Sequence, residues 1–253
     1  MNYEGLMVSA ERLLDEPFAS ILCYPKPNRL DLVKRVKELK KLGVKALEFT
    51  GEKHVLNMRV LGKGCVGIVV KAYRNGEAVA LKIRRIDADR SMMQHEADML
   101  KTANQVGVGP DFLGVSRNLL LMQFIDGVLL PEWLKKFRGE KSFKKVLKEL
   151  LEQCWRLDMA GLDHGELSRA PKHVIITCED KPFIVDFESA SLNRKPSNVT
   201  SIAQFLFISG GVSEEITEKL GCKDKTKVME ALRQYKADRN RQNFEKLLKT
   251  CEL

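Results

Sequence analysis

The 253-residue sequence predicts an α+β fold in two parts: a small antiparallel β unit that carries one main helix, and then a mostly helical unit. Two apolar, β-branched runs at 68–73 and 78–84 are separated by an Asn-Gly turn, which is typical of a β-hairpin. Residues 142–159 instead place apolar side chains at helical spacing. A chain of this length that is 44% hydrophobic can bury a sizeable core.

A glycine-rich segment precedes the hairpin. Gly62, Gly64 and Gly67 form a Gly-x-Gly-x-x-Gly pattern, which is weak evidence alone because dinucleotide-binding folds and ordinary turns share it. In a dinucleotide-binding fold the last glycine opens a helix, whereas here it opens a strand. The glycines therefore lie between two strands and form a lid, whose backbone N–H groups can approach phosphate oxygens.

Lys82 lies on the second strand of the hairpin, where its ammonium group can reach beneath this lid to a phosphate of ATP. Residues 91–105 follow as a predicted helix. Glu96 on that helix is the candidate to hold Lys82 in place through an ion pair. The simpler interpretation of a helical Glu is a solvated side chain.

A further apolar strand at 119–124 leads into a predicted hinge. There the backbone of Gln123 and Ile125 would hydrogen-bond adenine, and Met122 would line the pocket behind it, although a lone Met is more often a core residue. The residues expected to contact ATP are Leu61, Gly62, Gly64, Gly67, Val69, Ala80, Lys82, Met122, Gln123 and Ile125.

The second part supplies two candidate carboxylates. Glu166 stands in a His-Gly-Glu segment that follows the long helix, and Asp186 ends an apolar strand. We expect Asp186 to hold Mg²⁺ and Glu166 to position or deprotonate an acceptor hydroxyl. An Asp after a strand is more often a cap than a metal ligand. However, five such pieces in this order, on these element types, predict a bilobal protein-kinase-like fold.

The chain resembles the small atypical kinases of the RIO group and the KEOPS-complex kinase. More closely, it is similar to the archaeal proteins usually labelled predicted serine/threonine protein kinases. The segments that carry the resemblance are 61–69, 79–82, Glu96, 164–168 and 185–188. The resemblance implies an ATP- and Mg²⁺-dependent kinase with an unidentified protein substrate. The Phe-Glu after Asp186 and the missing Ala-Pro-Glu motif fit the RIO type.

Two departures from ordinary kinases bear on the mechanism. Glu166 stands where kinases carry Asp, and Pro171 stands where they carry a metal-binding Asn. An apparent two-residue insertion would move that position to His173, which is either a metal ligand or a structural or nucleotide-facing hydrogen-bonding residue, since Mg²⁺ prefers oxygen. The alternatives are a slow or specialised kinase, an ATPase, a nucleotide-binding pseudokinase and a factor whose binding to RNA, the ribosome or a protein partner is switched by nucleotide state. A weaker alternative is a small-molecule kinase of the aminoglycoside phosphotransferase kind.

The net charge of +9 is unevenly spread. Within 26–45, apolar residues recur at helical spacing and basic residues occupy the other faces, which predicts a helix packed on the small part. Its basic face is either solvated or a contact to the phosphates of RNA or the ribosome. We expect a basic N-terminal helical extension at 1–50, the small lobe at 51–126 and the large lobe at 127–253.

The remaining composition is that of a cytoplasmic protein. The amino end lacks a basic-then-apolar signal pattern, and no apolar stretch approaches about 18 residues, so we expect no membrane contact. The six cysteines are scattered, without a Cys-x-x-Cys pair, which argues against a zinc site or a disulfide framework.

Overall fold

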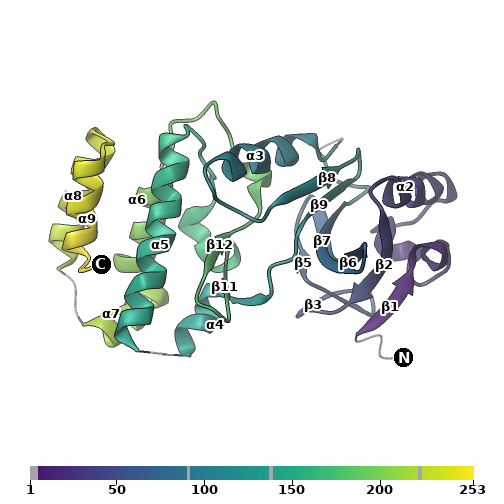
Figure 1. The fold of residues 1–253 in the computed structure, drawn as a ribbon, viewed down its shortest axis with the longest axis horizontal. Coiled ribbons are helices and arrows are strands. Elements are labelled where there is room, and N and C mark those ends of the chain that lie inside the picture. The colour runs from purple at the N-terminus through teal and green to yellow at the C-terminus, as the bar shows by residue number, and fades with distance from the viewer. Residues whose placement is uncertain (1–4, 90–91, 137–138, 222–223) are drawn as a thin grey trace. The chain divides into compact units, whose positions relative to one another are not determined.

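The computed structural model describes residues 5–89, 92–136, 139–221 and 224–253. The chain divides into two compact units, which we call the sheet unit (Met1–Asp98 and Asp111–Phe124) and the helical unit (Met99–Pro110 and Ile125–Leu253). The sheet unit contains an antiparallel sheet and the helical unit contains most of the helices (Figure 1). The predicted α+β class is confirmed.

The sheet unit is built on one sheet with the strand order β1-β2-β6-β7-β9-β8, and β5 pairs beside β6. Its strands are β1 (Leu6–Ser9), β2 (Val44–Phe49), β5 (Gly62–Lys63), β6 (Gly67–Arg74), β7 (Glu77–Arg84), β8 (Phe112–Val115) and β9 (Leu119–Gln123). A separate hairpin pairs β3 (Lys53–Val55) with β4 (Met58–Val60). The predicted turn joins β6 to β7, because Asn75 and Gly76 have φ angles of 53° and 83°.

The two faces of this sheet have different partners. Side chains alternate between faces along a strand, and Leu119 and Leu121 of β9 lie in the main hydrophobic core. Leu120, between them, packs on the other face with Met93 and Ala97 at the start of α3 (Gln94–Gln105). The face that α3 covers is the one on which the predicted ATP contacts lie.

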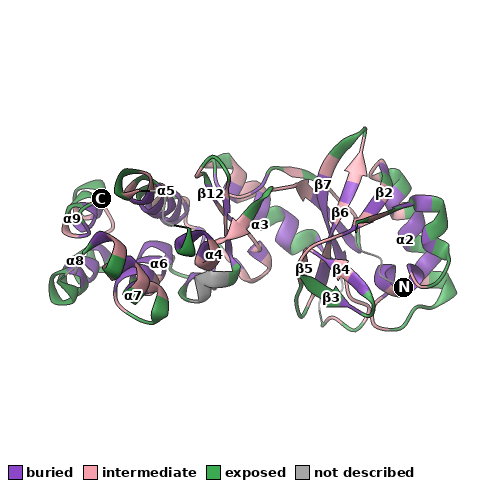
Figure 2. Ribbon diagram, turned by 90° about the horizontal axis from the view of Figure 1, so that it is seen from below, coloured by how far each residue is buried: buried purple, intermediate pink, exposed green. Residues whose placement is uncertain are grey.

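Helix α2 (Arg29–Lys41) covers the main core. Leu32, Val36 and Leu39 lie in that core, and the outer side of the helix is exposed (Figure 2). Asn28 caps the helix by accepting a hydrogen bond from the backbone N–H of Asp31 at 2.9 Å. The predicted helix, with its apolar stripe on the small part, is therefore confirmed.

The segment 1–50 is not a separate extension, in contrast to the boundary we expected. Its strands β1 and β2 belong to the sheet, since β2 pairs antiparallel with β6, and it also contains η1 (Ala10–Leu14) and α1 (Ala19–Leu22). The strand signal of β2 is weak because Lys45 and Glu48 interrupt its apolar residues within six positions. The neighbouring basic helix dominates the pattern of this segment.

The helical unit is built on the long helix α5 (Glu140–Met159), which buries one face and exposes the other (Figures 1 and 2). The other helices are α4 (Leu130–Lys135), α6 (Asn198–Phe207), α7 (Gly211–Leu220), α8 (Lys225–Ala237) and α9 (Arg241–Thr250). A small antiparallel sheet contains β10 (Gly127–Leu129), β11 (Val174–Thr177) and β12 (Pro182–Ile184). Two 3₁₀ turns, η2 (Leu167–Lys172) and η3 (Phe187–Ser189), carry the loops of the candidate site. Among the described residues, no helix combines the length and hydropathy that crossing a membrane requires.

Replacement of Gly127 by Ala tests the packing of the small sheet. A Cβ at Gly127 would lie 2.4 Å from the carbonyl oxygen of Ile176, so β10 would have to move away from β11. We expect the free energy of unfolding to fall by about 1–3 kcal/mol, measured by urea denaturation. Gly211→Ala is the matched control, because that position is helical and open. Equal midpoints for the two variants would contradict the packing described.

Candidate functional site

The ion pair predicted between Lys82 and Glu96 is present. Lys82 Nζ donates to Glu96 Oε1 at 2.9 Å, and both side chains are about 5% exposed. A buried charge requires a partner of opposite sign, and here β7 supplies one member and α3 the other. The pair therefore fixes the direction of the Lys82 side chain.

Gly67 makes room for the lysine. A Cβ at this position would lie 3.1 Å from Lys82 Cγ and 3.0 Å from the carbonyl oxygen of Ile83. The same glycine accepts, through its carbonyl oxygen, a hydrogen bond from the N–H of Gly64 at 2.8 Å. Arg85, which directly follows β7, donates from its guanidinium to the carbonyl oxygen of Gly64 at 3.2 Å. The glycine-rich lid is thus tied to the strand that carries Lys82.

Four of the predicted ATP contacts share one face of the sheet. Val69 pairs with Lys82 across β6 and β7, and Ala80 pairs with Met122 across β7 and β9. Directly paired residues project to the same face, and the alternate positions on these strands fill the main core. Leu61 directly precedes β5 at the start of the lid, and its N–H donates to the carbonyl oxygen of Val69 at 2.9 Å.

The predicted hinge is only partly suited to its expected role. The N–H of Gln123 already donates to the carbonyl of Asp111 at 2.9 Å, so only the carbonyl of Gln123 could bond adenine. Ile125 is half-buried and belongs to the helical unit.

In the helical unit, Glu166 and His173 lie together. Glu166 Oε2 is 3.1 Å from His173 Nε2, and Glu166 Oε1 accepts a hydrogen bond from the hydroxyl of Ser189 at 2.6 Å. His173 is buried. At this distance an imidazole N–H can donate to a carboxylate oxygen, which accepts hydrogen bonds. Both oxygens of Glu166 are therefore oriented by other side chains.

Asp186 lies next to this pair. It has a left-handed backbone, with φ of 71°, between β12 and η3. His173 Nδ1 is 3.7 Å from Asp186 Oδ2, and that ring nitrogen is buried without a hydrogen-bond partner in the described part of the chain. His173 thus stands between the carboxylates of Glu166 and Asp186.

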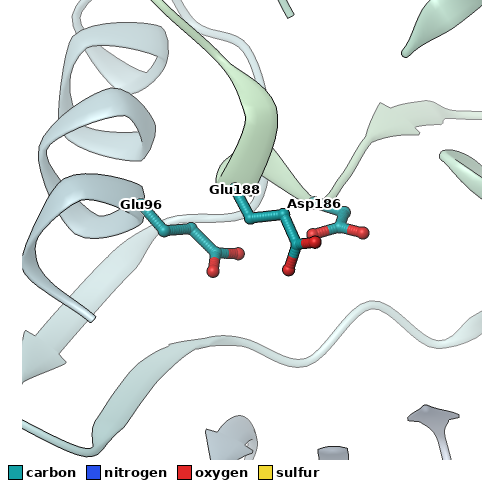
Figure 3. A group of neighbouring side chains, drawn as sticks. All are labelled: Glu96, Asp186 and Glu188. Carbon is teal, nitrogen blue, oxygen red and sulfur yellow. The ribbon is translucent and has the colours of Figure 1, made fainter. Parts of the chain in front are cut away.

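Glu188 adds a second carboxylate beside Asp186. Oxygens of the two side chains come within 4.8 Å of one another (Figure 3; Glu96 in that view belongs to the sheet unit). Two carboxylates at this separation are a donor set of the kind that Mg²⁺ prefers, since it takes one or two carboxylates and keeps several waters. The residues present therefore fit the predicted metal.

His164 anchors the loop that carries Glu166. Its backbone N–H donates to Asn198 Oδ1 at 2.9 Å, and its Nε2 lies 3.1 Å from the carbonyl oxygen of Val185. Burial lowers the pKa of His164 to about 4, so the ring is neutral at neutral pH. The next residue, Gly165, has φ of +87°, and a Cβ there would meet the guanidinium of Arg194 at 2.5 Å.

Sequence reasoning assigned no site role to Glu188 or Ser189. For Glu188 a signal existed, because an acidic residue stands where ordinary kinases have glycine after Asp-Phe. For Ser189 none did, because its contact with Glu166 depends on η3 turning the chain back. The long helix expected at 142–159 begins slightly earlier, at Glu140, and the Ser142 hydroxyl within it donates to Asp180.

A β unit with a glycine-rich lid over a paired lysine, together with a helical unit that carries grouped carboxylates, defines a kinase-like protein. Comparison with known proteins gives the family. A family model described as RIO domain matches residues 45–202, more than half of the chain, and the chain belongs to the RIO domain family. This membership implies an atypical protein kinase or ATPase activity.

A second comparison concerns a relative from an archaeon. The chain is 31% identical over 99 residues to the uncharacterized protein MJ1211 of Methanocaldococcus jannaschii. The alignment covers 39% of this chain and 83% of that protein. The similarity agrees with the archaeal proteins that the sequence resembles.

The neutral state of His164 predicts a pH dependence of stability. The unfolded chain takes up a proton below about pH 6.5, whereas the folded protein does so only near the lowered pKa of about 4. The stability contributed by the neutral ring is complete above pH 6.5 and falls as the pH decreases towards 4, by on the order of 3 kcal/mol at most. The measurement is urea unfolding at several pH values in EDTA.

The variant His164→Gln isolates this contribution, since glutamine does not titrate. Its free energy of unfolding should depend less steeply on pH between 6.5 and 4 than that of the wild type. Parallel pH profiles for the two proteins would show that His164 is not held neutral by the fold.

Proposed function

We propose that this protein is an ATP-dependent phosphotransferase, and specifically a serine/threonine protein kinase of the RIO-like atypical group. The observation that carries the proposal is the buried Lys82–Glu96 pair at 2.9 Å beneath a glycine-rich lid. In kinases this pair aims the ammonium group at the α- and β-phosphates of ATP. Val69, Ala80 and Met122, on the same sheet face, supply an apolar surface for adenine.

Mg²⁺ is assigned to Asp186 and Glu188 of the helical unit. When bound, the ion would neutralise charge on the β- and γ-phosphates. His173 is the less suitable ligand, since Mg²⁺ prefers oxygen and Nε2 of this residue already contacts Glu166. We therefore assign His173 to positioning Glu166.

Glu166 is the proposed base. Its contact with the Ser189 hydroxyl at 2.6 Å is of the length that a base needs toward the hydroxyl of a substrate. In the reaction, the acceptor oxygen bonds to the γ-phosphorus, the bond from that phosphorus to the bridging oxygen breaks, and ADP leaves. The acceptor proton passes to the carboxylate of Glu166, which His173 holds through its other oxygen.

A nucleotide-binding protein without phosphotransfer is the second candidate. It is favoured by the same carboxylate, since both oxygens of Glu166 are already engaged by Ser189 and His173. An acceptor hydroxyl would then have to displace Ser189. The two candidates agree on ATP binding and differ on turnover.

Substitution of Glu166 by Gln separates them. For a kinase or ATPase, the removal of the base lowers kcat by about 10²–10⁴-fold, while ATP affinity changes little. The assay measures transfer from labelled ATP to myelin basic protein and release of free phosphate, with Mg²⁺ present. Glu179→Gln, in an exposed turn of the same unit, is the matched control.

Two results would contradict the proposed kinase site. One is a wild-type protein that binds ATP but yields neither phosphoprotein nor phosphate. The other is turnover that persists unchanged in Asp186→Asn, which would place the metal-dependent chemistry elsewhere or assign it to a contaminant. Lys82→Met should lose ATP binding. This variant tests the role proposed for Lys82 separately from turnover.

A further inference from the structure

A basic cavity lies in the sheet unit, outside the predicted ATP contacts. Its volume is about 380 Å³. Its walls are α2, the end of β7 and the turn between β8 and β9. The lining residues are Asp31, Lys34, Lys37, Glu38, Lys41, Arg84, Arg117 and Asn118. Five of these are basic and two are acidic, so the lining carries a clear positive excess.

The acidic residues are already engaged. Glu38 accepts hydrogen bonds at 2.9 Å from the backbone N–H of Asn118 and at 2.6 Å from its side-chain amide, and a third from the hydroxyl of Ser116. Asp31 accepts from the amide of Asn28 at 2.6 Å and lies 3.9 Å from Lys34. Neither carboxylate neutralises Lys37, Lys41 or Arg117 through a contact of this kind.

Arg84 and Arg117 line the same cavity. Asn118 fixes Arg84 by accepting two hydrogen bonds from its guanidinium, at 3.1 and 2.9 Å. Burial, and next the positive charge of Arg117, lower the pKa of Arg84. Two positive charges that line one cavity favour the binding of an anion there.

The lysines form a row along α2. Lys34, Lys37 and Lys41 are spaced i, i+3 and i+7, which places them on one helix face over about 10 Å of helix. All three are exposed. Successive phosphates of one nucleic-acid strand advance by about 3.4 Å along a duplex axis, so this row can face several of them at once.

All the described residues that line the cavity have charged or polar side chains. Pockets for small organic ligands are lined mainly by hydrophobic and aromatic groups, and protein interfaces have an apolar centre from which Lys is depleted. Surfaces that bind nucleic acid are instead polar and strongly positive. We propose that this cavity and its lysine row bind the phosphodiester backbone of a nucleic acid, independently of base sequence.

The test measures binding of a fluorescently labelled single-stranded RNA 20-mer by anisotropy, between 50 and 200 mM salt, with DNA of the same sequence in parallel. For about five contacts, log K should fall with log salt at a slope near −3.5, which is a loss of about 100-fold over this range. Lys37→Gln with Arg117→Gln should weaken binding at low salt by roughly tenfold or more. The slope should become shallower by about 1.4.

The matched control is Lys40→Gln with Lys45→Gln. These two exposed lysines lie nearby but outside the cavity, beside Glu11, and the change in net charge is identical. The control should retain most of the wild-type affinity. Equal weakening in both double variants would overturn the proposal, because binding would then follow net charge rather than the cavity.

Three further outcomes are decisive. Similar affinity for RNA and DNA supports recognition of the backbone alone, and tighter RNA binding identifies RNA as the source of the phosphates. Displacement of the labelled strand by millimolar inorganic phosphate would overturn the proposal in favour of a small-anion site. Binding of polyglutamate in preference to RNA would overturn it in favour of an acidic protein partner. None of these results depends on ATP turnover, so they stand apart from the proposed kinase activity.

Discussion

The ion pair between Lys82 and Glu96 is the interaction on which the account of this protein depends. Both groups are almost wholly removed from water in the sheet unit, and the desolvation of each ion costs several kcal/mol. Apolar replacements of similar volume often stabilise a protein as well as such a pair does, so fold stability is a poor explanation for its presence. The proposed binding of ATP phosphates by Lys82 explains the pair better, because the ammonium group would then have to be held in one direction. The surrounding sequence agrees, since Gly67 leaves space for the lysine stem.

In the helical unit, several acidic side chains lie close together, and two histidines hold the loops that carry them. His173 separates Glu166 from Asp186, with one ring nitrogen toward each carboxylate. The neutral ring of His164 anchors the same loop. Its Nε2 contacts the carbonyl oxygen of Val185, which follows β12, and its backbone N–H donates to Asn198 of α6. The longer arm of Glu166 is thus restrained at both oxygens. In ordinary kinases a shorter Asp occupies this place, and the restraint is one way to compensate for the extra methylene.

The central hairpin and the two main helices of the sheet unit could be predicted because their signals are local. Apolar, β-branched runs indicated the strands that carry Val69 and Lys82, Asn75-Gly76 indicated their turn, and the 3.6-residue period of α2 identified its buried stripe. The strand β2 was missed because it is short and interrupted by charges, although it pairs along β6. The pairing of Glu96 with Lys82 could also be predicted, because a helix with an acidic residue follows the lysine strand directly along the chain. Two other features could not be predicted: the contact between Ser189 and Glu166, and the cavity that Arg117 lines together with α2. Both depend on contacts between residues far apart in the chain, which the pattern of a single sequence does not reveal.

The central proposal is that Glu96 aims the ammonium group of Lys82 at the phosphates of ATP within the sheet unit. A double-mutant cycle on ATP affinity tests it most directly, using calorimetry with the wild type, Lys82→Met, Glu96→Gln and the double variant in Mg²⁺. If Glu96 acts on ATP through Lys82, the losses should be coupled by about 0.5–3 kcal/mol. Losses that add to within about 0.3–0.5 kcal/mol, or a Lys82 variant that binds ATP like the wild type, would contradict the account.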